Sequence, residues 1–246
     1  MRDRKQAPKS LPMPLSTIVV PTYNERYNLL DLAQSVSALG ESVRLIIVDD
    51  ASPDGTGELA DALAREFPHI SVINRAGKLG LGTAYVEGFR RALADGADYV
   101  FSMDGDLSHD PAFIPQFWNA LEAHDVVVGS RYLRGISVVN WPLRRLILSQ
   151  FANVYASRML GLRIKDCTSG YVGYRREVLE AIHLESISSE GYAFLIELKA
   201  RCQRCGYRLS EVPIIFIDRR AGSSKLSKTV MLEAFWLPWR MMLERR

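Results

Sequence analysis

An apolar run at residues 99–103 stops abruptly at two carboxylates separated by one glycine, Asp104, Gly105 and Asp106. β-Branched and aromatic residues bounded by Gly and Asp predict a buried strand that runs out to the carboxyl edge of a sheet. Open α/β sheets bind ligands at that edge, so the two acids are predicted to face a ligand. In an extended segment the side chains at i and i+2 point the same way, and Gly105 leaves room for a ligand beside the backbone.

Two hard oxygen ligands on one side of a strand suit Mg²⁺ or Mn²⁺, which commonly take one or two carboxylates together with substrate phosphates. The alternative is a surface turn, because Asp and Gly are ordinary turn formers. A single DxD pattern also arises often by chance. Judged from this segment alone, a metal site and a surface turn therefore explain Asp104 and Asp106 about equally well.

Other apolar segments also have the character of buried strands, at residues 16–20, 45–48, 70–73, 126–131 and 212–217. The first two are each followed by a segment with helical spacing of apolar residues, and a glycine-rich turn leads from the third into another helix. Repeated strand–helix units of this kind predict an α/β fold. In the last segment Pro213 marks an edge strand or a strand start.

Length and composition permit one soluble domain, or one domain with an appendage, because 246 residues can bury a full core. The formal charge of +3 is small and gives no reason to expect a nucleic-acid partner. No window reaches the roughly 18 uninterrupted apolar residues of a membrane span, and the basic start lacks an apolar signal core. We therefore expect a cytosolic protein.

The chain has 3 cysteines, an odd number that fits a reducing compartment. Cys202 and Cys205 form a CxxC pattern, which is half of a zinc site or a redox pair. No second CxxC or histidine cluster accompanies it, and it lies in a helical pattern. Structural burial as small apolar side chains is the favoured interpretation.

Polar side chains follow the second and third strands. Asp50 is a candidate ligand for a ribose or a base N–H, because it stands where a strand ends. Asp54 and Thr56 are better explained by capping of the next helix. The glycine-rich turn at residues 74–84 places Lys78 within reach of a phosphate, although the turn matches neither a P-loop nor GxGxxG.

Two residues near the later strands have competing interpretations. His109 is a possible ligand or base, but a capping or packing role at the start of the following helix is favoured. Arg131 ends the strand at 126–131, where a guanidinium suits bidentate phosphate binding. A surface ion pair explains Arg131 equally well.

Residues 136–162 mix Trp141 and aliphatic residues with Arg144 and Arg145. This mixture predicts either an amphipathic element in a membrane interface, with both arginines facing anionic headgroups, or a core helix that crosses the sheet. Residues 230–243 are too short and too interrupted to span a bilayer, so they either lie on one or pack on the core.

The two remaining segments are polar. The basic, proline-containing residues 1–14 predict a flexible tail. Residues 218–225 form a basic loop with Gly and two serines, and its Arg219 and Lys225 are predicted to fold over an anionic ligand.

Together, six motifs in this order resemble the family 2 glycosyltransferases, and within them the polyprenol-phosphate (dolichol-phosphate) mannosyl synthases. The motifs are PTYNE, VDDASPDGT, KLGLGTA, MDGDLSHDP, GSR and FIDRRAGSSK. The resemblance implies a GT-A nucleotide-diphospho-sugar transferase fold, with a mostly parallel central sheet flanked by helices, at about residues 15–228. Residues 229–246 then form a C-terminal amphipathic segment.

Carried over position by position, the resemblance implies a donor site for GDP-mannose. The guanosine part would be held by Pro21, Tyr23, Glu25, Val48 and Asp50. Mg²⁺ or Mn²⁺ and the diphosphate would be held by Asp104, Gly105 and Asp106. The donor and acceptor phosphates would be held by Arg131, Arg219 and Lys225.

Some members of the family carry glutamine, a further metal ligand, where this chain has Ser108, so that contact falls to Ser108 or to water. Other members append transmembrane helices. The membrane contact of this chain must then come from residues 136–162, from the C-terminal segment, or from an anchoring partner protein. The implied location is peripheral, on the cytoplasmic face of a membrane.

The implied acceptor, a polyprenol or dolichol phosphate, is already largely an oxyanion at pH 7 and needs no general base. What the reaction needs instead is compensation of the diphosphate charge, which the metal ion, Arg and Lys supply. A single displacement would invert the anomeric centre. Transfer of glucose or another hexose, and a non-catalytic nucleotide-sugar or lipid-binding module, stay open, whereas the missing GxGxxG speaks against a dehydrogenase.

Overall fold

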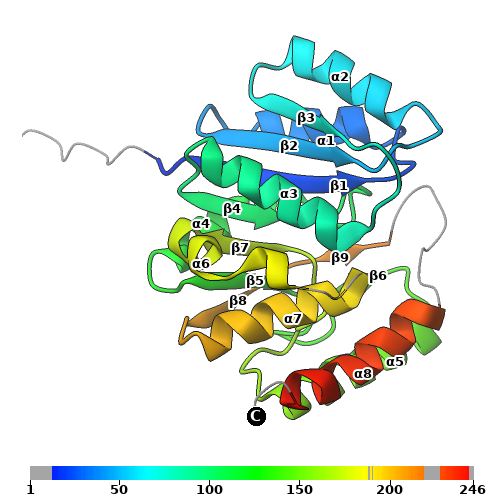
Figure 1. Cartoon of the computed structure of the whole chain (residues 1–246), viewed down its shortest axis with the longest axis vertical. Helices are drawn as coiled ribbons and strands as arrows, with labels where there is room; N and C mark the ends of the chain where they lie inside the picture. The colour runs from blue at the N-terminus through cyan, green and yellow to red at the C-terminus, as the bar shows by residue number, and fades with distance from the viewer. Residues whose placement is uncertain (1–12, 188, 190, 219–227, 244–246) are drawn as a thin grey trace, which may run out of the picture.

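The structure is a computed structural model that describes residues 13–187, 189, 191–218 and 228–243 (Figure 1). A seven-stranded sheet lies at its centre, in the order β3-β2-β1-β4-β7-β5-β8. Its strands are β1 (Ser16–Thr22), β2 (Val43–Asp49), β3 (Ile70–Asn74), β4 (Tyr99–Ser102), β5 (Val126–Ser130), β7 (Val172–Arg175) and β8 (Leu209–Pro213). β7 runs antiparallel to its neighbours β4 and β5, and the other pairs are parallel. The predicted α/β fold with a mostly parallel sheet is confirmed.

Helices cover both faces of the sheet. The α-helices of the described residues are α1 (Leu29–Ser37), α2 (Thr56–Glu66), α3 (Leu81–Ala94), α4 (Ile114–Leu121), α5 (Leu143–Leu160), α6 (Arg176–Ala181), α7 (Gly191–Arg204) and α8 (Lys228–Leu243). Single 3₁₀ turns lie at Pro111–Phe113 and Leu184–Ser186. Parallel strands joined by such helices bring their carboxyl ends to one edge.

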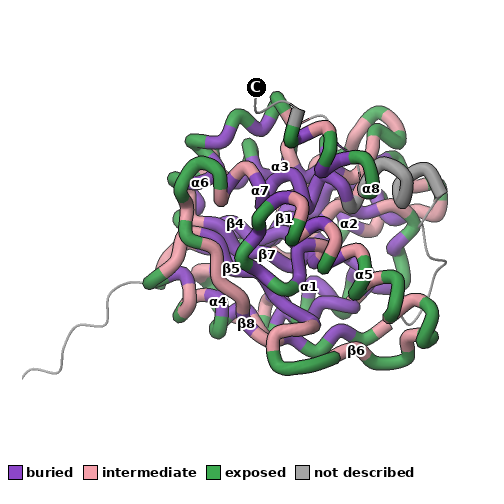
Figure 2. The backbone as a smooth tube through the Cα atoms, turned by 90° about the horizontal axis from the view of Figure 1, so that it is seen from below, coloured by how far each residue is buried: buried purple, intermediate pink, exposed green. Residues whose placement is uncertain are grey.

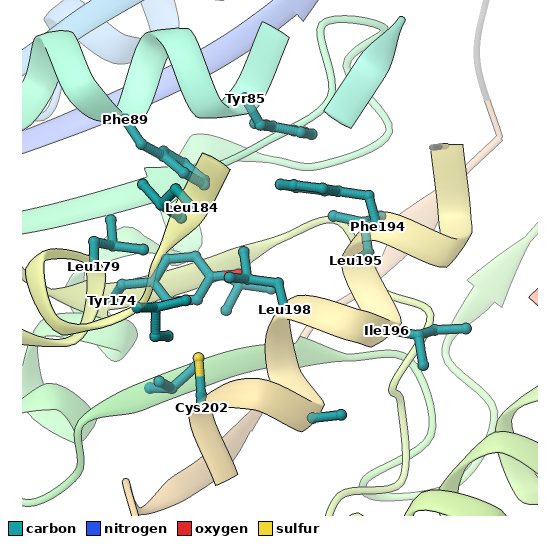
Figure 3. Packing of buried hydrophobic residues seen from close by; sticks show 14 of the residues in the cluster. Tyr85, Phe89, Tyr174, Leu179, Leu184, Phe194, Leu195, Ile196, Leu198 and Cys202 are labelled. Carbon is teal, nitrogen blue, oxygen red and sulfur yellow. The ribbon is translucent and has the colours of Figure 1, made fainter. Parts of the chain in front are cut away.

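Two apolar clusters hold the layers together, one on each face. Side chains from α1, α2 and α4 pack on one face, and side chains from α3, α6 and α7 pack on the other. The central strands are buried almost throughout, as the purple tube in Figure 2 shows. In the second cluster Phe194 of α7 stacks on Tyr85 of α3, with ring centroids 5.9 Å apart (Figure 3).

The predicted strand at 212–217 is split. β8 ends at Pro213, and β9 (Phe216–Ile217) pairs with β6 (Val138–Val139) in a separate two-stranded sheet. β8 is the last strand of the main sheet, so the edge position that Pro213 predicted is confirmed.

α5 and α8 lie side by side at the periphery, below α7 in Figure 1. The Tyr155 and Phe235 rings stack with centroids 5.2 Å apart, and Trp239 Nε1 donates to the Tyr155 hydroxyl at 2.9 Å. Ile147 and Phe151 of α5 are 59% and 63% exposed. The C-terminal part of α5 packs into the core through Ala156 and Leu160, whereas its N-terminal part is exposed, so α5 is only partly a core helix. Among the described helices, none is both long and apolar enough to cross a membrane.

Candidate active site

The acid pair lies just beyond the end of β4. The strand ends at Ser102, and Leu107 has a φ of +60°, so the chain turns instead of staying extended. Asp104 keeps 38% of its side chain exposed, whereas Asp106 is only 6% exposed. The extended segment in which both side chains would point the same way is not kept beyond β4, because the chain turns at Gly105 and Asp106.

Asp106 is tied to Ser108. Its Oδ1 accepts hydrogen bonds from the Ser108 N–H at 3.1 Å and from the Ser108 hydroxyl at 2.5 Å. Ser108 is 2% exposed, so its hydroxyl is turned toward the carboxylate rather than outward. Ser108 positions Asp106, which differs from the independent ligand contact that the sequence suggested.

His109 packs beneath the acid pair. Its Nδ1 accepts a hydrogen bond from the Asp104 N–H at 3.2 Å, which assigns the ring proton to Nε2. The ring lies 5.1 Å from that of Tyr171 and 5.4 Å from that of Phe216. Burial lowers the pKa of His109, against the raising effect of Asp104. The favoured packing role is confirmed.

Two glycines border the acids in different ways. A Cβ at Gly105 would lie 3.1 Å from Val20 Cγ1 and 3.3 Å from Thr22 Cγ2, so the space beside it is filled by β1 rather than left for a ligand. A Cβ at Gly170 would lie 3.1 Å from Asp104 Oδ1. Gly170 is thus the point where backbone comes closest to the exposed carboxylate.

Arg131 forms a buried ion pair with Asp166. Its Nε and Nη2 donate to the two carboxylate oxygens at 2.7 and 2.6 Å, and its backbone N–H donates at 3.0 Å. Burial would raise the pKa of Asp166, but the Arg131 charge and hydrogen bonds lower it. The surface ion pair expected as one alternative is wrong, because the Arg131 and Asp166 side chains are 7% and 0% exposed.

The loop that carries Asp166 is held from below by Lys199 of α7. The Lys199 ammonium donates to the carbonyls of Cys167, Ser169 and Leu195 at 3.1, 2.8 and 3.0 Å. Burial lowers the pKa of Lys199 to about 8. A buried amine with three acceptors fixes the backbone that approaches Asp104 at Gly170.

Asp50 lies at the same edge of the sheet, after β2. Its carboxylate accepts hydrogen bonds from the Arg75 guanidinium and, at 3.0 Å, from the Gly80 N–H. Asp50 therefore anchors the glycine-rich turn. In that turn Lys78 Nζ lies 3.9 Å from the centroid of the Tyr23 ring.

The other residues expected at the nucleotide site differ in how far they are exposed. Pro21 and Tyr23 are partly exposed. Glu25 is 9% exposed, and its Oε2 accepts from Asn28 at 3.0 Å. Val48 is fully buried against α3, so its side chain cannot contact a ligand, and only its backbone remains for that role. Asp54 is tied to the start of α2, because the Thr56 N–H donates to Asp54 Oδ1 at 3.0 Å, although the N-cap residue itself is Gly55.

A cavity of about 210 Å³ opens from Asp104 toward α5 and α8. Polar side chains line it near Asp104 and Arg131, with the Trp141 and Phe216 rings among them, and mostly apolar side chains line it along α5 and α8. The polar lining includes Asp104, His109, Arg131, Arg145, Ser149 and Thr168. The apolar lining includes Leu148, Phe151, Ala152, Tyr155, Ile196 and Phe235.

Arg145 belongs to this cavity. Its Nη1 donates to both carboxylate oxygens of Asp218 at 2.8 and 3.0 Å, and its Cζ lies 4.1 Å from the Trp141 ring centroid. The expectation that Arg145 faces lipid headgroups is wrong for this arrangement, whereas Arg144 is exposed. Arg219 and Lys225 lie outside the described residues.

The comparisons with known proteins agree with this geometry. The family model "Glycosyl transferase family 2" matches residues 17–182, well over half of the chain. The chain belongs to glycosyl transferase family 2. It is therefore a glycosyltransferase.

Two curated relatives are similar over most of their length. Polyprenol monophosphomannose synthase of Mycolicibacterium smegmatis is 44% identical over 227 residues, covering 92% of this chain and 86% of that protein. Undecaprenyl-phosphate mannosyltransferase of Micrococcus luteus is 44% identical over 217 residues, covering 88% and 89%.

A solved structure with the same fold is glucosyl-3-phosphoglycerate synthase from Mycobacterium tuberculosis, in complex with Mn²⁺, UDP and glucosyl-3-phosphoglycerate. It superposes with a TM-score of 0.66 at 22% identity, covering 95% of this chain and 80% of that one. The same enzyme with Mg²⁺ and UDP gives a TM-score of 0.66 at 22% identity, covering 95% and 79%. At this identity the likeness shows the fold alone, which is the GT-A fold.

Sequence reasoning missed Asp166, Lys199 and Arg75 as parts of the site. Asp166 gave one weak signal, an acid at the start of the DCTSG loop. Lys199 lies in an otherwise apolar helical stretch, where a lysine is an unusual neighbour for buried residues. Arg75 follows the third strand directly, as the ligand candidates follow the others.

Proposed function

We propose that the protein transfers mannose from GDP-mannose to a polyprenol (dolichol) monophosphate, giving polyprenyl-phosphate-mannose. The two curated relatives, each 44% identical over most of the chain, carry names that state mannosyl transfer to such lipid phosphates. The donor nucleotide is carried over from the motifs PTYNE and VDDASPDGT.

The observation that carries the proposal is the cavity between Asp104 and the α5–α8 pair. Its lining combines a carboxylate and the guanidinium groups of Arg131 and Arg145 with apolar side chains of α5 and α8. A lipid phosphate has this same division into an anionic head and a hydrocarbon chain. A sugar or other water-soluble acceptor gives no reason for the apolar wall formed by Leu148, Phe151 and Phe235.

Asp104 and Asp106 would hold the metal. Within the described part of the chain, no group of three or more His, Cys, Asp or Glu side chains is arranged to bind an ion. The protein therefore offers a set of two hard oxygen donors, which fits Mg²⁺ or Mn²⁺ when diphosphate oxygens complete the shell. When bound, such an ion compensates the charge of the diphosphate leaving group.

The residues of the chain provide the other conditions for transfer. Arg131, oriented by Asp166, and Arg145, paired with Asp218, line the cavity where the acceptor phosphate would enter. An oriented phosphate oxyanion can attack the anomeric carbon in line, without a general base. A single displacement inverts the configuration at that carbon. Arg219 and Lys225 are assigned to the donor and acceptor phosphates by the family motif.

Membrane contact would come from the outer faces of α5 and α8. Leu143, Ile147, Phe151 and Val154 of α5 are 69%, 59%, 63% and 49% exposed. Trp236 and Trp239 of α8 are 61% and 47% exposed, and indole rings favour the interface between headgroups and hydrocarbon. We place the protein peripherally on the cytoplasmic face of a membrane, where an anchoring partner is the alternative to direct contact.

A panel of radiolabelled nucleotide sugars tests the donor and the acceptor together. The protein is incubated with GDP-mannose, GDP-glucose, UDP-glucose or UDP-galactose, each with polyprenyl phosphate or with 3-phosphoglycerate, in Mg²⁺ or Mn²⁺. We expect label in the organic phase with GDP-mannose and polyprenyl phosphate. If label is transferred from another nucleotide sugar instead, that sugar is the donor. If no pair gives transfer, the result favours a non-catalytic binding module.

A further inference from the structure

Asn153 is the first buried residue along α5, and its side chain is polar. Of the 18 residues of α5, all of which the structure describes, only Asn153, Ala156 and Leu160 are buried. Asn153 is 2% exposed. A buried amide is unfavourable unless its donors and its acceptor are satisfied, so its hydrogen bonds must account for its place in the helix.

Two backbone groups of opposite kind hold the Asn153 amide in one orientation. Its Oδ1 accepts from the Thr168 N–H at 3.0 Å, and its Nδ2 donates to the Ser149 carbonyl at 2.9 Å. Exchanging the oxygen and the nitrogen would set donor against donor and acceptor against acceptor. Nδ2 is therefore also the donor in its 3.1 Å contact with Thr168 Oγ1. Asn153 thus holds Thr168 at two points, the N–H and the hydroxyl.

The Thr168 hydroxyl links Asn153 to the buried ion pair. It accepts from Asn153 Nδ2 at 3.1 Å and from Arg131 Nη2 at 2.7 Å, which uses both of its lone pairs. Its own proton is then directed to Asp166 Oδ1 at 3.2 Å. One chain of hydrogen bonds therefore runs from α5 to the Arg131 guanidinium.

The helix that Asn153 anchors carries much of the cavity wall. The side chains of α5 that line the cavity include Leu148, Phe151, Ala152 and Tyr155. Between Leu143 and Asn153 the helix has no buried side chain, so apolar packing does little to set its position there. One turn earlier, the Tyr132 hydroxyl donates to Ser149 Oγ at 2.8 Å. The position of the wall relative to Arg131 thus depends on polar contacts.

We propose that Asn153 is a positioning residue for the lipid acceptor: through Thr168 it fixes the α5 wall relative to the Arg131 guanidinium, and so sets the spacing at which one acceptor's hydrocarbon and phosphate are bound. This inference rests on the proposed function, because it takes the cavity as the acceptor site. A wall that is fixed in advance favours binding, since less has to be ordered when the acceptor enters. The residues assigned to the nucleotide follow β1 and β2 instead, so binding of the donor should not depend on Asn153.

Two substitutions remove the amide and leave side chains of different size, Asn153→Leu and Asn153→Ala. An effect that both share comes from the lost hydrogen bonds and not from the fit of one side chain. Ser157→Ala is the matched control one turn further along α5, because the Ser157 hydroxyl donates to the carbonyls of Asn153 and Ile164 at 2.6 and 3.3 Å. Initial rates of mannose transfer are measured with polyprenyl phosphate and GDP-mannose varied in turn, and thermal unfolding is measured on the same proteins.

We expect both Asn153 variants to raise the KM for polyprenyl phosphate by about tenfold and to leave the KM for GDP-mannose within about twofold of the wild type. Ser157→Ala should keep both KM values near those of the wild type. Thr168→Val should also raise the acceptor KM. Combining it with Asn153→Leu should raise the acceptor KM by less than the product of the two single effects, because both residues belong to one chain of hydrogen bonds.

An unchanged acceptor KM in either Asn153 variant, or equal increases in the KM values for acceptor and donor, overturns the role of Asn153 and leaves the proposed function standing. Single effects that multiply in the double variant would show that Asn153 acts without Thr168, which also overturns it. If the wild type transfers no mannose to polyprenyl phosphate, the proposed function fails and this inference fails with it.

Discussion

Arg131 and Asp166 meet in a two-point ion pair in the protein interior, with Nε–Oδ2 and Nη2–Oδ1 distances of 2.7 and 2.6 Å, although 35 residues separate them along the chain. Thr168 adds a third contact, because its hydroxyl accepts from Arg131 Nη2 at 2.7 Å. The pair joins the end of β5 to the loop that approaches Asp104. It therefore connects the stability of the fold to the geometry of the site.

Asp166→Asn should destabilise the protein by about 3–5 kcal/mol, because it leaves the buried Arg131 guanidinium without its counter-charge. Urea unfolding at pH 7 measures the change. The control is Asp95→Asn, which breaks the exposed Arg91–Asp95 pair at 2.8 Å and should cost under about 1 kcal/mol. Equal losses of unfolding free energy in both variants would contradict the larger contribution assigned to the buried pair.

The Arg131–Asp166 pair also predicts how the stability of the protein depends on pH in the acid range. The pKa of Asp166 is lowered below 3.8 in the folded protein, so its stabilisation is complete above that value and is lost as pH falls through the folded pKa. The stability difference between wild type and Asp166→Asn should therefore shrink below about pH 3.8. A difference that stays constant down to pH 2 would argue against a lowered pKa.

Lys199 predicts a trend of the same sign at alkaline pH. Its pKa falls from 10.5 to about 8 on burial, so between these values the unfolded chain binds a proton that the folded chain does not. Stability conferred by Lys199 then rises with pH across this window, by about 3 kcal/mol at most. Unfolding of wild type and Lys199→Met, compared from pH 7.5 to 10.5, isolates this contribution. A flat difference would show that the three carbonyls keep the ammonium charged.

Membrane contact through α5 is tested by a charge on its outer face. Ile147→Asp should weaken binding to vesicles of anionic lipid by tenfold or more, because a large apolar side chain contributes about 1.5–3 kcal/mol when it leaves water. The control is Leu30→Asp on α1, where the side chain is 46% exposed on a different surface. Sedimentation with vesicles gives the bound fraction. Equal binding by both variants would remove α5 from the contact, and binding only with a second polypeptide would move the anchor to a partner.

Much of the fold was predictable, because it depends on local patterns. Apolar runs that end in polar residues predicted β1 to β5, and helical spacing predicted the helices between them. The antiparallel strand β7 was not predicted. Its four residues, Val172–Arg175, are too few for a clear pattern, and their place between β4 and β5 depends on contacts distant in sequence.

The acidic residues at the strand ends could be predicted from the sequence, but the residues that hold the site in place could not. Asp104 and Asp50 stand at strand ends, which local sequence reveals. Asp166 and Lys199 act through contacts with residues more than 25 positions away, which no local pattern contains. Arg145 was placed on the wrong side of its helix, because an exposed-looking basic pair does not reveal that Asp218 lies within 2.8 Å.

The most direct test of the central claim is the initial rate at which label from GDP-[¹⁴C]mannose appears in polyprenyl phosphate, measured for wild type and Asp104→Asn at saturating Mg²⁺. Asp104 is 38% exposed, so the substitution should leave the fold intact, as circular dichroism would confirm. The account predicts labelled lipid with the wild type, its loss in excess chelator, and a rate at least about 100-fold lower with Asp104→Asn. Equal rates for the two proteins, or an undiminished rate in chelator, would contradict it.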